Sequence, residues 1–77
     1  MDKSFRDENL LIEVGKRLRV LRDAKGLKQR EMADILGIQI RRYQRFVYGE
    51  VNMPLSTLIF FADFFGVTTD FLLGRED

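Results

Sequence analysis

Glycines divide this chain into five short segments of helical character. Five of the six glycines lie where a run of helically spaced apolar residues stops. Glycine favours the left-handed backbone conformation found just beyond a helix C-terminus. The five are Gly26, Gly37, Gly49, Gly66 and Gly74. No run alternates long enough to predict a strand. The pattern therefore predicts a compact all-α domain of five helices.

Each predicted helix carries one apolar face, and these faces together must form the core. In chain order the apolar positions are Leu11, Val14, Leu18 and Leu21; Met32, Ala33 and Leu36; Tyr43, Phe46 and Val47; Leu58, Phe61, Ala62 and Phe65; Phe71 and Leu72. Thr68 is the expected N-cap of the last helix. Residues 1–9 are polar and expected to be frayed, so the sequence predicts a single domain over residues 10–77.

The composition excludes several classes of protein. The 77 residues include no cysteine and no histidine, which removes disulfides, Cys/His zinc sites and histidine-based catalysis. The two serines, Ser4 and Ser56, have no histidine to activate them. We expect neither an enzyme nor a cofactor or metal. The longest apolar run, residues 58–62, is too short to cross a bilayer, so we expect an intracellular protein.

The charged residues are segregated along the chain. From Val14 to Arg45 there are ten basic and three acidic residues, a net charge of +7, whereas the remainder carries −6. A basic centre of this kind is typical of a surface that binds a polyanion. Charged residues that only solvate helix faces would give the same count, and the charge alone leaves both readings open.

The third predicted helix has a polar face opposite its apolar one. At 100° per residue, Arg41, Gln44 and Arg45 project away from the apolar positions. Arginine can donate two hydrogen bonds to guanine, and glutamine can pair with adenine. This face would fit a DNA major groove, and a solvated basic face is the alternative.

Lys28 stands at the expected start of the second helix, where its side chain cannot accept a capping hydrogen bond. A phosphate bound there would satisfy both the free backbone N–H groups and the lysine. The alternative is a tolerated surface lysine that costs a few tenths of a kcal/mol.

The segment GLKQREMADILGI, residues 26–38, resembles the helix-turn-helix of the phage repressor and Cro family, also called the XRE family. Residues 14–22 resemble the first helix of that family, and residues 58–74 resemble its last two helices. The resemblance covers about residues 12–74. It implies a five-helix repressor-like DNA-binding domain of a cytoplasmic, bacterial or phage-encoded transcriptional regulator. That regulator would be a repressor that reads double-stranded DNA with the helix at about 39–48.

The resemblance also implies roles for individual residues. The base-facing positions are Ile40, Arg41, Gln44 and Arg45. The expected phosphate contacts are Lys28, Gln29, Arg42 and Asn52. Ile40 could instead pack against the core, and both roles stay open.

Three departures from the family pattern accompany this resemblance. Lys28 and Gln39 replace the usual small hydroxyl caps, and the proline after the recognition helix is displaced by one position, to Pro54. Val47 replaces the acid that would pair with an arginine at position 22. Arg22 would then pair with Glu50 or be free for a phosphate. The loop over residues 48–55 is expected to differ from the family norm.

Phe60 and Phe64 lie one helical turn apart, away from the apolar stripe of their helix. We expect them to form a homodimer interface that sets two recognition helices about 34 Å apart. The alternative is packing against Phe5, Leu10 and Leu11.

A second function remains possible for the same fold. In that reading the chain is a protein-interaction module, such as an antirepressor or an antitoxin-like component. Its surface would be Val47, Tyr48, Val51 and Met53. In the repressor reading we expect no ligand-binding domain, so a signal would act through a protein partner that relieves repression, through proteolysis, through the protein level or not at all.

Overall fold

The computed structural model describes residues 8–76, and this part of the chain is all-helical, as predicted. Its helices are α1 (Glu8–Ala24), α2 (Gln29–Leu36), α3 (Ile40–Val47), α4 (Leu55–Phe65) and α5 (Thr69–Leu73). α1 begins two residues before the predicted domain start, so Glu8 and Asn9 are helical. The rest of the segment expected to be frayed, residues 1–7, lies outside the described residues.

The five glycines that were predicted to follow helical segments lie at the expected places. All five glycines have positive φ, between 69° and 75°. Gly37 illustrates their role, because it follows α2 and its N–H donates to Asp34 O at 3.1 Å. The next N–H, of Ile38, donates to Ala33 O at 3.0 Å. These bonds satisfy carbonyls that the helix end leaves free.

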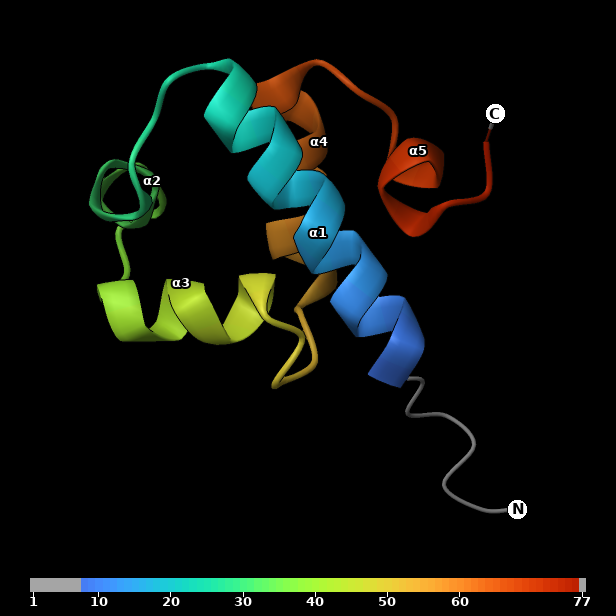
Figure 1. Cartoon of the computed structure of the whole chain (residues 1–77), viewed down its shortest axis with the longest axis horizontal. Coiled ribbons are helices and arrows are strands. Elements are labelled where there is room, and N and C mark those ends of the chain that lie inside the picture. The colour runs from blue at the N-terminus through green and yellow to red at the C-terminus, as the bar shows by residue number, and fades with distance from the viewer. Residues whose placement is uncertain (1–7, 77) are drawn as a thin grey trace.

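α1 is the central helix of the fold. Figure 1 shows it crossing the middle of the molecule, with α2 and α3 on one side and α5 on the other. Packing contacts join α1 to α3, α4 and α5. The buried core contains Val14, Leu18, Met32, Ala33, Tyr43, Val47, Phe61, Ala62 and Leu72. Full burial of a side chain such as Phe61, which is 0% exposed, contributes about 1.5–3 kcal/mol.

The backbones of α1 and α3 approach closely at Gly15. A Cβ added to Gly15 would lie 2.0 Å from the carbonyl oxygen of Val47, closer than any real side chain permits. Only glycine therefore allows α3 to end against α1 in this position. The lack of a side chain at residue 15 fixes where α3 lies relative to the rest of the domain.

The helix N-termini are capped unequally. The Thr68 hydroxyl accepts from Phe71 N–H at 2.9 Å, which confirms the predicted cap of α5. At α2, Glu31 Oε1 accepts from the backbone N–H of Lys28 at 2.8 Å, and the Lys28 side chain has no acceptor to return the bond. The Gln39 side chain makes no capping bond at α3. α2 and α3 therefore keep backbone donors at their N-termini.

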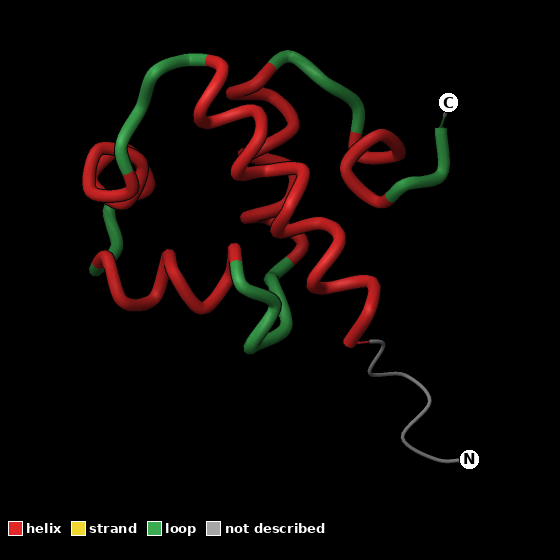
Figure 2. The backbone as a smooth tube through the Cα atoms, viewed as in Figure 1, coloured by secondary structure: helices red, strands yellow, loops and turns green. Residues whose placement is uncertain are grey.

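The loops differ in length (Figure 2). Short loops join α2 to α3 and α4 to α5, whereas residues 48–54 form a longer excursion between α3 and α4. Among the described residues, no helix combines the length and apolar character needed to cross a bilayer.

Candidate nucleic-acid interface

α3 is divided into a buried face and an exposed one. Tyr43, Phe46 and Val47 are 1%, 4% and 0% exposed. Arg41, Arg42 and Arg45 are exposed, and Gln44 and Ile40 are half-buried. Ile40 also packs against the core cluster. The predicted opposition of an apolar and a basic face is therefore confirmed.

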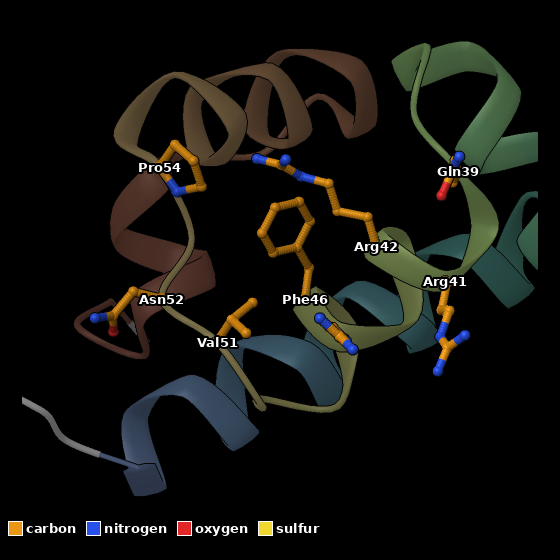
Figure 3. Close-up of a pocket in the computed structure, with 8 residues that line it drawn as sticks. Gln39, Arg41, Arg42, Phe46, Val51, Asn52 and Pro54 are labelled. Carbon is orange, nitrogen blue, oxygen red and sulfur yellow. The ribbon is translucent and has the colours of Figure 1, made fainter.

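An open hollow of about 590 Å³ lies beside α3 (Figure 3). Its floor is apolar, and arginine and amide side chains surround it. The lining residues are Gln39, Arg41, Arg42, Arg45, Phe46, Val51, Asn52 and Pro54. A second hollow of about 350 Å³ is lined by Arg41, Gln44, Arg45, Tyr48 and Glu50. Because Arg41 and Arg45 line both hollows, they stand between them on the outer side of α3.

Arg42 lies over a core aromatic ring. Its guanidinium carbon is 5.4 Å from the centre of the Phe46 ring, and in Figure 3 the side chain extends past that ring toward Pro54. Asn52 is exposed and lines the same hollow from the α3–α4 loop. Two of the residues predicted to contact phosphate thus lie around one concave surface.

Gln29 and Gln44, predicted to contact phosphate and base respectively, are joined directly. Gln44 Nε2 donates to Gln29 Oε1 at 2.7 Å. Gln29 Nε2 in turn donates to the Tyr48 hydroxyl at 3.3 Å. The Arg19 guanidinium lies 4.7 Å from the centre of the Tyr48 ring and donates to Val47 O. α1, α2 and the end of α3 therefore meet in one polar network.

Sequence reasoning missed the parts that Tyr48 and Arg19 play in this network. The one available signal was spacing, because Tyr48 follows Gln44 by four residues and so shares its helix face. No local pattern connects either residue to Gln29 or Arg19.

Both alternatives predicted for Arg22 are wrong. Its side chain is only 11% exposed, and its partners are Tyr43 and Asp23 rather than Glu50. Nη1 donates to the Tyr43 hydroxyl at 3.3 Å, and Nη2 lies 3.2 Å from Asp23 Oδ1. Nε has no partner in the described part of the chain. The Tyr43 hydroxyl therefore takes the place of the carboxylate that the family pattern has at position 47, where this chain has valine.

Burial and the Arg22 charge shift the pKa of Tyr43 in opposite directions. Burial raises the pKa of its hydroxyl above the usual range for tyrosine, and the Arg22 guanidinium opposes that shift without cancelling it. The Tyr43 hydroxyl is therefore a neutral partner for Arg22 at physiological pH.

Three of the ten basic residues counted in the sequence donate hydrogen bonds to a backbone carbonyl or to a core hydroxyl. Arg17 Nη1 donates to Leu72 O at 3.1 Å, at the end of α5. Arg19 and Arg22 make the contacts given above. These cations stabilise the ends of helices and a buried hydroxyl. The expected basic surface is consequently carried by fewer residues than the charge count suggests.

The remaining predicted residues are dispersed. Lys28 is exposed at the N-terminus of α2. Phe60 and Phe64 are half-buried, pack against the core and stack on each other with ring centres 5.9 Å apart. Lys25 Nζ lies 5.5 Å from the centre of the Phe64 ring. Val47 is fully buried, so its expected place on a protein-interaction surface is wrong.

Comparison with known proteins gives two findings. Residues 18–72 match the protein family described as helix-turn-helix. The SPbeta prophage-derived uncharacterized HTH-type transcriptional regulator YonR of Bacillus subtilis (strain 168) is 42% identical over 59 residues, which cover 77% of this chain and 55% of that relative. The chain thus spans about half the length of the curated relative that it matches. No solved structure matches the chain significantly.

Proposed function

The chain belongs to the XRE-type helix-turn-helix family, and on this premise we propose that it is a sequence-specific DNA-binding transcriptional regulator. The observation that supports this best is the outer face of α3. Arg41 and Arg45 are exposed there, and neither forms an ion pair with any described residue. Their guanidinium groups are therefore available to donate to guanine O6 and N7.

In the proposed mechanism α3 enters the major groove, which is about 12 Å wide and admits a helix. Arg41, Gln44 and Arg45 meet base edges. The phosphate contacts come from both sides of that face, with Lys28 and Gln29 at the N-terminus of α2 and Arg42 and Asn52 around the larger hollow. Backbone N–H groups at the N-terminus of α2 add to the anion site.

The proposed regulator is a repressor that works as a homodimer. Two copies joined through Phe60 and Phe64 would place their recognition helices about 34 Å apart and match a two-fold operator. Bound there, the dimer blocks polymerase or a competing regulator. A protein partner that binds the repressor would relieve the block.

Selection from a random duplex DNA pool at about 100 mM salt tests this function, because phosphate contacts weaken as salt rises. An enriched motif with two-fold symmetry is the expected result. Retention of DNA without any enriched motif would contradict base reading. If no DNA is retained even at lower salt, the protein-interaction module becomes the better account, with Tyr48, Val51 and Met53 as its surface.

A further inference from the structure

Tyr48 ends a chain of hydrogen bonds that begins at a base-facing glutamine. From Gln44 the bonds pass through the Gln29 amide to the Tyr48 hydroxyl. In the structure each donor points the same way, from Gln44 toward Tyr48. The hydroxyl oxygen at the end accepts, so its own proton is free to be donated elsewhere.

The direction of this chain decides what Gln44 offers to DNA. With Nε2 turned to Gln29, Gln44 keeps Oε1 and one N–H for the groove. That pair matches the N6 donor and N7 acceptor of adenine. If every bond were reversed, Gln44 would turn its oxygen inward and offer only N–H groups. Those would match the acceptors of guanine or thymine.

We propose that Tyr48 is a positioning residue that links a DNA phosphate to the base chosen by Gln44. A phosphate oxygen can only accept, so a phosphate that contacts Tyr48 takes its hydroxyl proton. The Tyr48 oxygen must then accept from Gln29, and Gln29 must accept from Gln44. A phosphate contact that carries no sequence information thereby selects the orientation of Gln44 that prefers adenine. This inference rests on the DNA-binding function proposed above.

The structure holds Tyr48 where this role requires it. The residue is 47% exposed, so a phosphate can reach it. Its ring lies under the Arg19 guanidinium, which is itself held by Val47 O at the end of α3. A cation over an aromatic ring restrains the ring and adds positive charge near the site where the phosphate would lie.

The test compares DNA selections by the full chain and by variants. Gln44→Ala identifies the position in the motif that Gln44 reads, because the base preference at that position should disappear. Tyr48→Phe keeps the ring under Arg19 and removes only the hydroxyl. We expect Tyr48→Phe to reduce the preference for adenine over guanine at that same position by about tenfold, within the range of one bidentate contact. Preferences at the positions read by Arg41 and Arg45 should persist.

Tyr43→Phe is the matched control, since it removes the hydroxyl of a tyrosine in α3 that lies outside the network. It should leave the motif unchanged. If Gln44→Ala abolishes the base preference at one position and Tyr48→Phe leaves that preference unchanged, the inference is overturned while the proposed function stands. The same holds if Gln44→Ala abolishes the base preference at no position. If the unmodified chain enriches no motif, the proposed function itself has failed.

Gln44→Glu tests the orientation independently of Tyr48. A carboxylate offers only acceptors, so it imitates the outward oxygen of Gln44. We expect the variant to retain a base with an exocyclic amino group, adenine or cytosine, at that position. A switch from guanine or thymine to one of these bases would show that Gln44 had offered donors, and would overturn the inference.

Discussion

Arg22 and Tyr43 show how a neighbouring side chain can compensate for valine at position 47, where the family pattern has an acid. Where a carboxylate would pair with the Arg22 guanidinium, this chain has Val47 and uses the Tyr43 hydroxyl instead. A neutral acceptor satisfies a buried guanidinium less fully than a carboxylate does. Asp23 supplies a charged partner on the solvent side, with its own side chain 73% exposed. Burial, not the pairing with Arg22, therefore keeps the Tyr43 hydroxyl protonated.

Alkaline pH should weaken the fold through Tyr43. Burial raises the pKa of this hydroxyl in the folded state, so Tyr43 of the unfolded chain ionises first as the pH rises above about 10. The stability present below that pH is then lost as the pH approaches the folded pKa. We expect the urea midpoint to fall as the pH rises above about 10.

Tyr43→Phe separates this effect from the titration of other groups. The variant should be less stable at neutral pH by about 1–3 kcal/mol, because Arg22 loses an acceptor. Its loss of stability across the alkaline range should be smaller than that of the unmodified chain. Equal alkaline losses in both proteins would assign the effect to another group.

Arg45 should contribute to base discrimination more than to general affinity. Its side chain lines both hollows beside α3 and has no ion-pair partner among the described residues. Arg45→Ala is expected to cost about 1–3 kcal/mol of discrimination at one base position. Competition binding with single-base operator variants measures this. A uniform loss on all sequences would mean that Arg45 contacts phosphate.

At the scale of elements, the junction of α1 and α3 positions the outer face of α3. Gly15 in α1 leaves no room for a side chain beside Val47 O, and Arg19, one turn later, donates to the same oxygen. Both contacts are with the C-terminal end of α3, where a cation is electrostatically favoured. α1 therefore fixes the position of the C-terminal end of α3.

Gly15→Ala should displace α3 even though alanine favours helix. The propensity gain is about 1 kcal/mol, whereas a Cβ 2.0 Å from a backbone oxygen forces the two helices apart. We expect a net loss of about 1–3 kcal/mol, measured by urea unfolding, together with weaker binding to operator DNA. Val20→Ala, at a 67% exposed position of the same helix, is the control. Unchanged stability in Gly15→Ala would contradict the close packing.

Lys28→Ser should separate stability from DNA binding. A serine at this N-cap can accept from the free N–H groups of α2 and should stabilise the domain by about 0.5–2 kcal/mol. The same change removes a cation from the proposed phosphate site, so binding should weaken on all duplexes and the salt slope should fall by about one unit. Thermal unfolding and salt titrations report the two effects. An unchanged salt slope would remove Lys28 from the interface.

The sequence predicted the helices well because their signals are local. Gly37 and Thr68 act within one helical turn, and the opposed faces of α3 follow from spacing alone. The side-chain pairs were not predicted, because they depend on how helices pack. Gln44 and Gln29 are 15 residues apart, and Arg19 and Val47 are 28 apart. The failed alternatives for Arg22 have the same cause.

At the scale of the whole molecule, the basic residues divide between support and surface. Arg17, Arg19 and Arg22 bind carbonyls or a core hydroxyl. The three arginines of α3 remain exposed. The stretch that carries a net charge of +7 therefore stabilises the domain with one part of its charge and offers another part to solvent.

Self-association is predicted to depend on α4. Phe60 and Phe64 are half-buried, so their replacement would also disturb the core, whereas Ile59 on the same helix is 52% exposed. We expect Ile59→Lys to shift sedimentation equilibrium toward the monomer by placing a charge within a shared apolar surface. Val20→Lys is the control at an exposed apolar site of α1. A dimer that persists in Ile59→Lys would place the interface elsewhere.

The two faces of α3 also determine how the protein can change over evolutionary time. Tyr43, Phe46 and Val47 are buried, so most substitutions there reduce the stability of the fold and are selected against. Arg41 and Arg45 are exposed, so substitutions there should leave the fold intact. Descendants of one ancestral sequence can therefore acquire new DNA targets through a few outward positions while the scaffold is inherited intact.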